Sequence, residues 1–247
     1  MPEKNDVKPL VPLPDKCVTA RFLRRIKRFT VEAETATGKI LAHTNNTGSM
    51  LGLAKKGSQV LLSPASSQAR KLKWTLERVS DENDHAQGWI GVNTSLPNIL
   101  FKAAFEAGQL DFAEGYTEIF REVKCGLSRM DVCLKGFGKP VFWIECKNVS
   151  LVEDGIAAFP DAQSERACKH IQELMEIKKA GMRAAMFFLV QRNDCCAFAP
   201  ADYIDIQYAS LFYQALAQGV EMLAYCADFT ASGTNLGRKL PIMEKMF

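Results

Sequence analysis

The 247-residue chain is 47% hydrophobic and 24% charged, with a net charge of +3, a composition typical of globular proteins that bury a substantial core. No run of 18 apolar residues is present, and the N-terminal "MPEKNDVKPL" lacks the apolar segment of a signal peptide. We therefore expect a soluble, cytoplasmic protein with no membrane partner. None of the eight cysteines forms a C-x-x-C pair, which disfavours a zinc site.

The charge is distributed unevenly along the chain. Residues 1–80 hold 15 Lys and Arg against six Asp and Glu, a net charge of +9, whereas residues 81–247 carry −6. A basic front half followed by an acidic back half suggests two modules, the first of which faces a polyanion.

The front half predicts short strands separated by turn residues. After a Pro-rich leader, strand-like runs occupy residues 17–35, 40–44, 57–65, 72–80 and 88–96, with a Gly- and Asn-rich loop at 45–53. About five short strands within 90 residues suit a small closed barrel of the OB type. We expect a flexible leader at 1–13, an OB-like barrel that binds nucleic acid at 14–85, and a second domain at 86–247.

The second domain mixes helices and strands. Residues 98–108 have helical spacing and end in a glycine, and strands are predicted at 116–124, 129–135 and 141–147. A helix at 161–181 follows, with Asp161 as its expected N-cap, and then a buried strand at 183–191. The predicted class is α/β (α+β) with two domains, the second an α-β-β-β-α-β mixed-sheet domain.

Two of these strands carry charged residues at apolar positions. Glu145 and Lys147, in "FWIECKNVSL", lie on one face of a strand because side chains alternate. Asp131 lies on the preceding strand, joined by the Gly-containing hairpin "KGFGK", so an antiparallel pairing would bring it to Glu145. Two facing carboxylates repel unless a proton or a cation lies between them, and oxygen ligands suit Mg²⁺ or Mn²⁺.

Asp131 and Glu145-x-Lys147 on paired strands resemble the PD-(D/E)XK nuclease core, with Met130 in place of its leading proline. Over most of the chain, "HTNNTGSMLGL", "GVNTSLPN", "EVKCGLSRMDVCL", "IECKNVSL", "AFPDAQSERACKH" and "GVEMLAY" resemble the bacterial sugar fermentation stimulation protein A family. The resemblance implies an N-terminal OB-like domain, a nuclease-like second domain and DNA binding.

The resemblance also implies residue roles. Asp131, Glu145 and the backbone carbonyl of Cys146 would be metal ligands, and Lys147 the catalytic lysine. Glu106 or Glu122 would be a candidate for an additional acidic ligand, although a glutamate in such a position is more often an ordinary surface carboxylate.

Cations and aromatic residues alternate in "RFLRRIKRF", a pattern that suits a nucleic-acid groove. Phenylalanines in such a pattern are more often core residues. His170 is as typical of a half-buried helix residue as of a residue that contacts a phosphate. The residues that we expect to bind single- or double-stranded DNA are Arg21, Arg24, Arg25, Lys27, Arg28, Lys55, Lys56, Arg70, Lys71, Lys73, Arg166, Lys169 and His170.

Two functions remain open from the sequence. The first is a metal-dependent nuclease of low sequence specificity, and the second is a non-catalytic DNA-binding regulator of sugar (maltose) metabolism that retains the nuclease scaffold. A sugar hydrolase would leave Lys147 and the basic barrel unexplained. The sequence leaves open whether the protein forms a homodimer.

Overall fold

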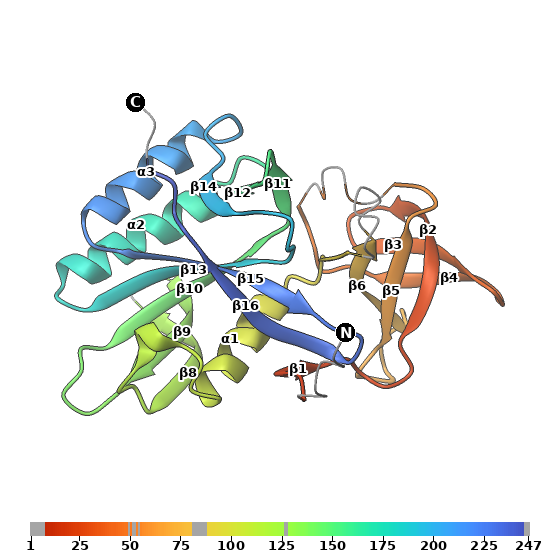
Figure 1. The fold of residues 1–247 in the computed structure, drawn as a ribbon, viewed down its shortest axis with the longest axis horizontal. Helices are drawn as coiled ribbons and strands as arrows, with labels where there is room; N and C mark the ends of the chain where they lie inside the picture. Colours follow the sequence, from red (N-terminus) through yellow and green to blue (C-terminus); the bar gives the residue numbers. More distant parts are fainter. Residues whose placement is uncertain are drawn as a thin grey trace, which may run out of the picture.

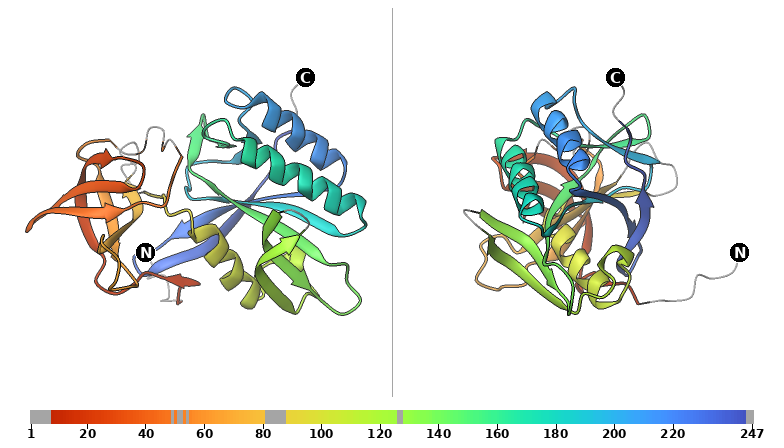
Figure 2. Two further views of the ribbon diagram at one scale, coloured as in Figure 1. Left: turned by 180° about the vertical axis from the view of Figure 1, so that it is seen from behind. Right: turned by 90° about the vertical axis from the view of Figure 1, so that its left-hand side faces the viewer.

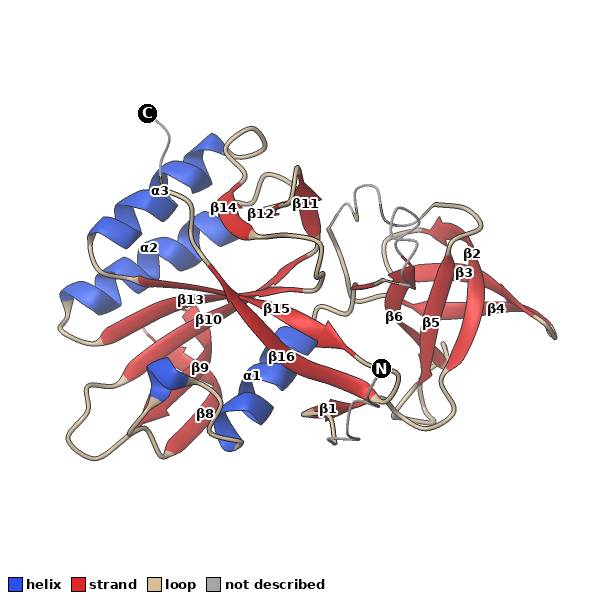
Figure 3. Cartoon of the chain, viewed as in Figure 1, coloured by secondary structure: helices blue, strands red, loops and turns tan. Residues whose placement is uncertain are grey.

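A computed structural model describes residues 8–48, 50, 53, 55–80, 88–125 and 128–244. The chain forms a barrel at one end of an elongated molecule and a larger mixed-sheet domain at the other (Figures 1 and 3). Within the described part of the chain, no helix is long and apolar enough to cross a membrane.

The N-terminal domain is a small β-barrel. Its sheet order is β4-β3-β2-β5-β6-β7, and a parallel pairing of β4 with β6 closes it. The strands are β2 (Val18–Ile26), β3 (Thr30–Thr35), β4 (Gly38–His43), β5 (Gln59–Pro64), β6 (Trp74–Ser80) and β7 (Trp89–Gly91). Alternate side chains of these strands, such as Val31, Leu62 and Leu76, fill the interior.

The C-terminal domain contains a seven-stranded sheet of order β1-β16-β15-β13-β10-β9-β8. Its central strands are parallel and its outer strands antiparallel. The strands are β1 (Val11–Pro12), β8 (Glu118–Cys125), β9 (Ser128–Lys135), β10 (Phe142–Val149), β13 (Arg183–Val190), β15 (Glu221–Phe229) and β16 (Gly233–Leu240).

Helices cover both faces of this sheet (Figure 2). Helix α1 (Leu96–Glu106) packs on one face through Leu100 and Phe101, followed by a short 3₁₀ turn, η1 (Asp111–Ala113). Helices α2 (Glu165–Lys179) and α3 (Ile206–Ala217) cover the other face. A small second sheet lies beside α3, formed by β11 (Leu151–Glu153), β12 (Ile156–Phe159) and β14 (Ala197–Pro200).

A buried arginine joins the two domains. Arg78 of β6 is 3% exposed, and its guanidinium donates to the carbonyls of Thr230 and Gly233 and to the Thr234 hydroxyl at 3.1, 2.8 and 3.1 Å. It also stacks on Phe229, 4.3 Å from the ring centroid. Burial lowers the pKa of Arg78 to about 10, so it remains a cation at neutral pH. These contacts fix the barrel against the β15–β16 hairpin.

The two-domain fold class predicted from the sequence is confirmed, but several details differ. Val11 and Pro12 of the expected leader pair with Thr234 and Gly233 of β16, so this part of the leader is a strand of the second domain. Residues 1–7, and those on both sides of the expected boundary at 85/86, lie outside the described residues. Strand β7 pairs with β6 and carries the barrel sheet to Gly91.

The start of the second helix was also predicted incorrectly. Its N-cap is Ser164 rather than Asp161, because the Ser164 hydroxyl accepts a hydrogen bond from the Ala167 N–H at 3.1 Å. A hydroxyl at this position satisfies a backbone donor of the first turn. Asp161 instead lies beside the barrel, where its carboxylate would be 2.6 Å from a Cβ on Gly48.

Candidate active site on β9, β10 and α2

Strands β9 and β10 bring Asp131 next to Glu145. Their antiparallel register pairs Val132 with Ile144, so Asp131 and Glu145 occupy the next opposing positions. The backbone pairing of β9 with β10 ends at Val132 and Ile144. The next contact is made by the Asp131 side chain, whose Oδ2 accepts a hydrogen bond from the Cys146 N–H at 2.9 Å. The predicted approach of the two carboxylates is therefore present in the structure.

The Asp131 carboxyl holds its proton more tightly than usual. Burial, followed by the charge of Glu145, raises its pKa to about 6 and outweighs the hydrogen bonds from the Cys146 N–H and Asn98. A carboxylate that is costly to ionise beside another carboxylate is a common feature of functional sites.

Glu145 is only 3% exposed and its two oxygens differ. Oε1 accepts from Lys147 Nζ at 2.6 Å and from His170 Nδ1. Burial alone would raise its pKa, but His170 and Lys147 outweigh that effect and hold the pKa below its usual value. Oε2 is buried without a hydrogen-bond partner, so the carboxylate keeps one oxygen that no described group binds.

Helix α2 supplies a second layer of contacts. His170 is buried, and its Nδ1 lies 3.1 Å from Lys147 Nζ. Arg166 Nε donates to His170 Nε2 at 3.4 Å, which favours the tautomer in which Nδ1 donates to Glu145. Because its ring is enclosed by these groups, His170 belongs to the acidic site rather than to an exposed DNA-binding surface.

Helix α1 contributes a residue that the sequence analysis did not identify. Asn98 Nδ2 donates to Asp131 Oδ1 at 3.3 Å, and the Asn98 Oδ1 is buried without a partner. Asn98 belongs to the segment "GVNTSLPN", but no spacing rule connects it to a carboxylate 33 residues further along the chain.

The two other acidic candidates lie differently. Glu106 ends α1 and forms an ion pair with Lys102, about two turns from Asn98. Glu122 is exposed and has a φ of 53°. It lies on β8 between the residues that pair with Val132 and Met130 of β9, at the level of Asp131. Neither carboxylate contributes to the shifted pKa of Asp131.

The donor set fits a hard divalent cation. Across the described residues, no cluster of three His, Cys, Asp or Glu side chains could hold a metal ion. The available donors are the carboxylates of Asp131 and Glu145, supplemented by the amide oxygen of Asn98 and by backbone carbonyls. Two of these oxygens, Glu145 Oε2 and Asn98 Oδ1, are buried acceptors without partners. Mg²⁺ and Mn²⁺ bind such oxygen sets and retain several waters.

The barrel cations that were predicted to bind DNA fall into two groups. Arg25 and Arg70 are half-buried and bind backbone: Arg25 donates to the carbonyls of Arg28, Asn46 and Gly48, and Arg70 to Trp74 O and the Thr75 hydroxyl. We therefore assign both a structural role. The exposed group consists of Arg21, Arg24, Lys27, Arg28, Lys55, Lys56, Lys71 and Lys73.

The two phenylalanines of "RFLRRIKRF" also divide into one buried and one exposed residue. Phe22 is 4% exposed and belongs to the barrel core, whereas Phe29 is 47% exposed. The Phe29 ring stacks on His43 with centroids 6.2 Å apart, and Arg28 lies 5.8 Å from its centroid. An exposed ring beside cations is a suitable surface for stacking a base.

A barrel loop lies next to the helices of the acidic site. Asn45 Nδ2 donates to Asn93 Oδ1 and to Ser95 Oγ, just before α1, at 2.6 and 2.9 Å. Gly48 lies against Asp161, just before α2. Since Arg25 holds the carbonyls of this loop, the barrel and the acidic site are structurally connected.

Comparisons with known proteins cover both domains. Residues 23–92 match the family model "SfsA N-terminal OB domain", and residues 95–233 match "Sugar fermentation stimulation protein RE domain". Two curated relatives are named "Sugar fermentation stimulation protein homolog". The one from Maridesulfovibrio salexigens is 53% identical over 95% of this chain and 97% of its own, and the one from Lawsonia intracellularis is 45% identical over 96% and 99%.

A solved structure has the same fold over nearly the whole chain. It is described as "The structure of Pyrococcus Furiosus SfsA in complex with Ca2+" and superposes with a TM-score of 0.87 at 26% identity, covering 96% of this chain and 100% of that one.

Proposed function

Since the chain belongs to the sugar fermentation stimulation protein family, with an OB domain and an RE domain, we propose that it binds DNA with low sequence specificity and hydrolyses phosphodiester bonds with the help of Mg²⁺ or Mn²⁺. The observation that carries this proposal is the arrangement of Glu145, whose Oε1 is held by Lys147 and His170 while its buried Oε2 has no partner.

In this proposal Asp131 and Glu145 hold the metal ion, together with a backbone carbonyl such as that of Cys146. Asn98 orients the Asp131 carboxylate through its amide. The related protein from Pyrococcus furiosus was solved with Ca²⁺, a cation that prefers the same kind of oxygen ligands. A bound metal ion would lower the pKa of a water molecule and stabilise negative charge on a phosphate.

The chain's own residues supply the remaining parts. Lys147 Nζ lies 2.6 Å from Glu145 Oε1 and would hold positive charge where negative charge develops during phosphodiester cleavage. His170 would keep Glu145 ionised and fixed in orientation. Arg166 and Lys169, exposed on α2, would contact the phosphates that flank the cleaved bond.

The barrel would hold the DNA strand through phosphate contacts. The exposed cations of the barrel and the Phe29 ring provide charge for the backbone and a stacking surface for bases. Since these contacts read no base edges, we expect low sequence specificity.

The deciding experiment compares wild type with Lys147→Ala on labelled single- and double-stranded DNA in Mg²⁺, Mn²⁺ or EDTA. We expect metal-dependent cleavage by wild type, and cleavage at least about a hundredfold slower in the variant, because a positioned charge or proton-transfer group contributes roughly 10²–10⁴ in rate. DNA affinity should change little. Lys102→Ala, which removes a partly exposed lysine from α1, is the matched control and should cleave normally.

A second candidate function is DNA binding without cleavage, in a regulator of sugar (maltose) metabolism. It is favoured by the contacts of Lys147 and His170 with Glu145, which compensate the buried charge without a metal ion. If wild type binds DNA but cuts no linear or branched substrate with either metal ion, this second function replaces the first.

A further inference from the structure

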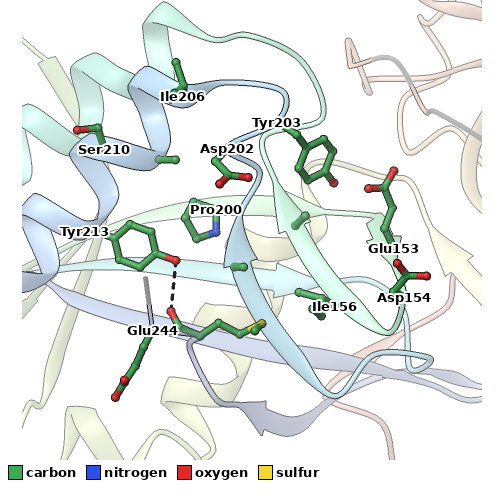
Figure 4. Close-up of a pocket in the computed structure, with 14 residues that line it drawn as sticks. Glu153, Asp154, Ile156, Pro200, Asp202, Tyr203, Ile206, Ser210, Tyr213 and Glu244 are labelled. Carbon is green, nitrogen blue, oxygen red and sulfur yellow. Dashed lines mark hydrogen bonds between the residues drawn. The ribbon is translucent and has the colours of Figure 1, made fainter. Parts of the chain in front are cut away.

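A cavity of about 590 Å³ lies between α3, the small sheet β11-β12-β14 and the segment that follows β16 (Figure 4). Its volume falls within the range of small-molecule sites. None of its lining residues belongs to the site around Glu145. The cavity is therefore separate from the residues that the proposed nuclease reaction uses.

The charge of this cavity has one sign. Glu153, Asp154, Asp202 and Glu244 line it, and among the described residues that line it none is Lys, Arg or His. In Figure 4 Glu153 and Asp154 lie on one side, Asp202 near the middle and Glu244 on the other side. Several separated carboxylates in one cavity attract a positively charged ligand.

Apolar and aromatic surface lies between the carboxylates. Ile156, Ala158, Ala199, Pro200 and Ala209 contribute apolar lining, and the rings of Tyr203 and Tyr213 stand on opposite sides of Asp202. Tyr203 and Ile206 are 59% and 78% exposed, unusually high values for large side chains beside a cavity. Such a lining suits methylene groups, and the rings also suit cations through their faces.

The lining side chains offer hydrogen-bond acceptors and almost no free donors. Burial and a hydrogen bond to Glu153 raise the pKa of Tyr203, so its hydroxyl proton is already used. The Tyr213 hydroxyl donates to Met243 O at 3.4 Å, which leaves the Ser210 hydroxyl as the remaining side-chain donor of the lining. A peptide brings as many carbonyl acceptors as N–H donors, whereas an amine ligand brings only donors.

In Figure 4 the carboxylates of the cavity occupy separate positions along it, whereas a metal ion needs its ligands within one coordination shell. Charges that are separated by apolar surface match a ligand whose own charges are separated by apolar links.

We propose that this cavity binds a linear aliphatic polyamine, a cation whose ammonium groups are separated by runs of methylene groups. The ammonium groups would pair with the carboxylates, and the methylene groups would lie on the apolar lining between the two tyrosine rings.

Titration calorimetry of the full-length protein with spermine, at low salt and without DNA or divalent metal, tests the proposal. We expect saturable binding of one spermine. Glu153→Gln combined with Asp202→Asn should weaken it about tenfold, the sum of two partly exposed ion pairs, and Tyr203→Ala should weaken it as well. The matched control, Glu114→Gln with Glu118→Gln, removes two exposed carboxylates, one directly after η1 and one at the first residue of β8, and should bind like wild type.

Several results would contradict the proposal. Equal spermine affinity in the cavity variant and the control variant, or full displacement of spermine by Mg²⁺ at equal charge concentration, would indicate diffuse attraction. Tighter binding of a lysine-rich peptide than of spermine would indicate a protein partner instead. Circular dichroism must show that the variants are folded. Asp131→Asn with Glu145→Gln should leave spermine binding intact, which separates this site from the proposed metal site.

Discussion

Glu145 shows how far single-residue reasoning from the sequence extends. The alternation of "FWIECKNVSL" predicted that Glu145 and Lys147 share a face, and Lys147 Nζ does lie 2.6 Å from Glu145 Oε1. The hairpin predicted the approach of Asp131. Neither pattern could reveal that His170 and Asn98 complete the cluster, because those contacts depend on how α2 and α1 pack on the sheet. Their roles in catalysis remain predictions.

Asp131 makes the stability of the metal-free protein depend on pH. Its pKa is raised from 3.8 to about 6 in the folded state, so the folded state binds this proton more tightly than the unfolded state. The stability contributed by the proton is complete below pH 3.8 and is lost as pH rises through about 6. In EDTA, Asp131→Asn should therefore melt at a higher temperature than wild type at pH 7.5, and the difference should shrink towards pH 4.

Calorimetric melting across this pH range, with added Mn²⁺ in a parallel series, is the measurement. Mn²⁺ should stabilise wild type and leave Asp131→Asn nearly unchanged. A melting difference that is constant across the pH range would show that Asp131 does not titrate as described.

At the scale of elements, long helices and strands with a regular hydrophobic repeat were predictable from the sequence. Short strands and strands that are buried on both faces were not. The stripe of α2 and the strands β8 to β10 are clear in the sequence, whereas β11, β12 and β14 have three or four residues each, too few for a period. Strand β15 is buried at most positions, so it shows no alternation, and α3 mixes buried and exposed apolar residues. All five of these elements were absent from the expected order, and four of them, β11, β12, β14 and α3, line the cavity.

The turn between β2 and β3 gives a test of DNA binding. Lys27 and Arg28 are exposed there, so replacing both with Ala should weaken binding to all DNA sequences alike and reduce the salt slope by about one unit per lost phosphate contact. Fluorescence anisotropy at several salt concentrations measures both quantities. An unchanged slope would remove this turn from the proposed DNA-binding surface.

The Arg25→Ala variant tests whether Arg25 stabilises the barrel, in contrast to the exposed Lys27 and Arg28. Its guanidinium binds carbonyls of the turn and of the loop beside Gly48, and leaving part-buried carbonyls without a donor costs about 1–3 kcal/mol each. We expect a clearly lower melting temperature for this variant, whereas Lys27→Ala with Arg28→Ala should melt like wild type.

At the scale of the molecule, Arg78 should determine whether the domains unfold together. Arg78→Ala removes a buried cation from two carbonyls and a hydroxyl of the other domain. We expect one cooperative melting transition in wild type and either two transitions or a strong destabilisation in the variant, because breaking such contacts typically costs several kcal/mol. Differential scanning calorimetry makes the comparison. Arg24→Ala, whose side chain is 68% exposed, should melt like wild type.

The pairing of β1 with β16 gives the protein an unusual order of assembly. Val11 pairs with Thr234, so the chain runs from a strand of the mixed-sheet domain through the barrel and later completes that same sheet with β16. During synthesis the barrel strands leave the ribosome early and can fold at once, since their contacts are close in sequence. Among the described strands, however, β1 pairs with β16 alone, so it has no partner strand until β16 has been made. Ribosome-bound chains that stop before residue 233 should therefore contain a folded barrel whose N-terminal segment is still accessible to proteases, and completion of β16 should protect it.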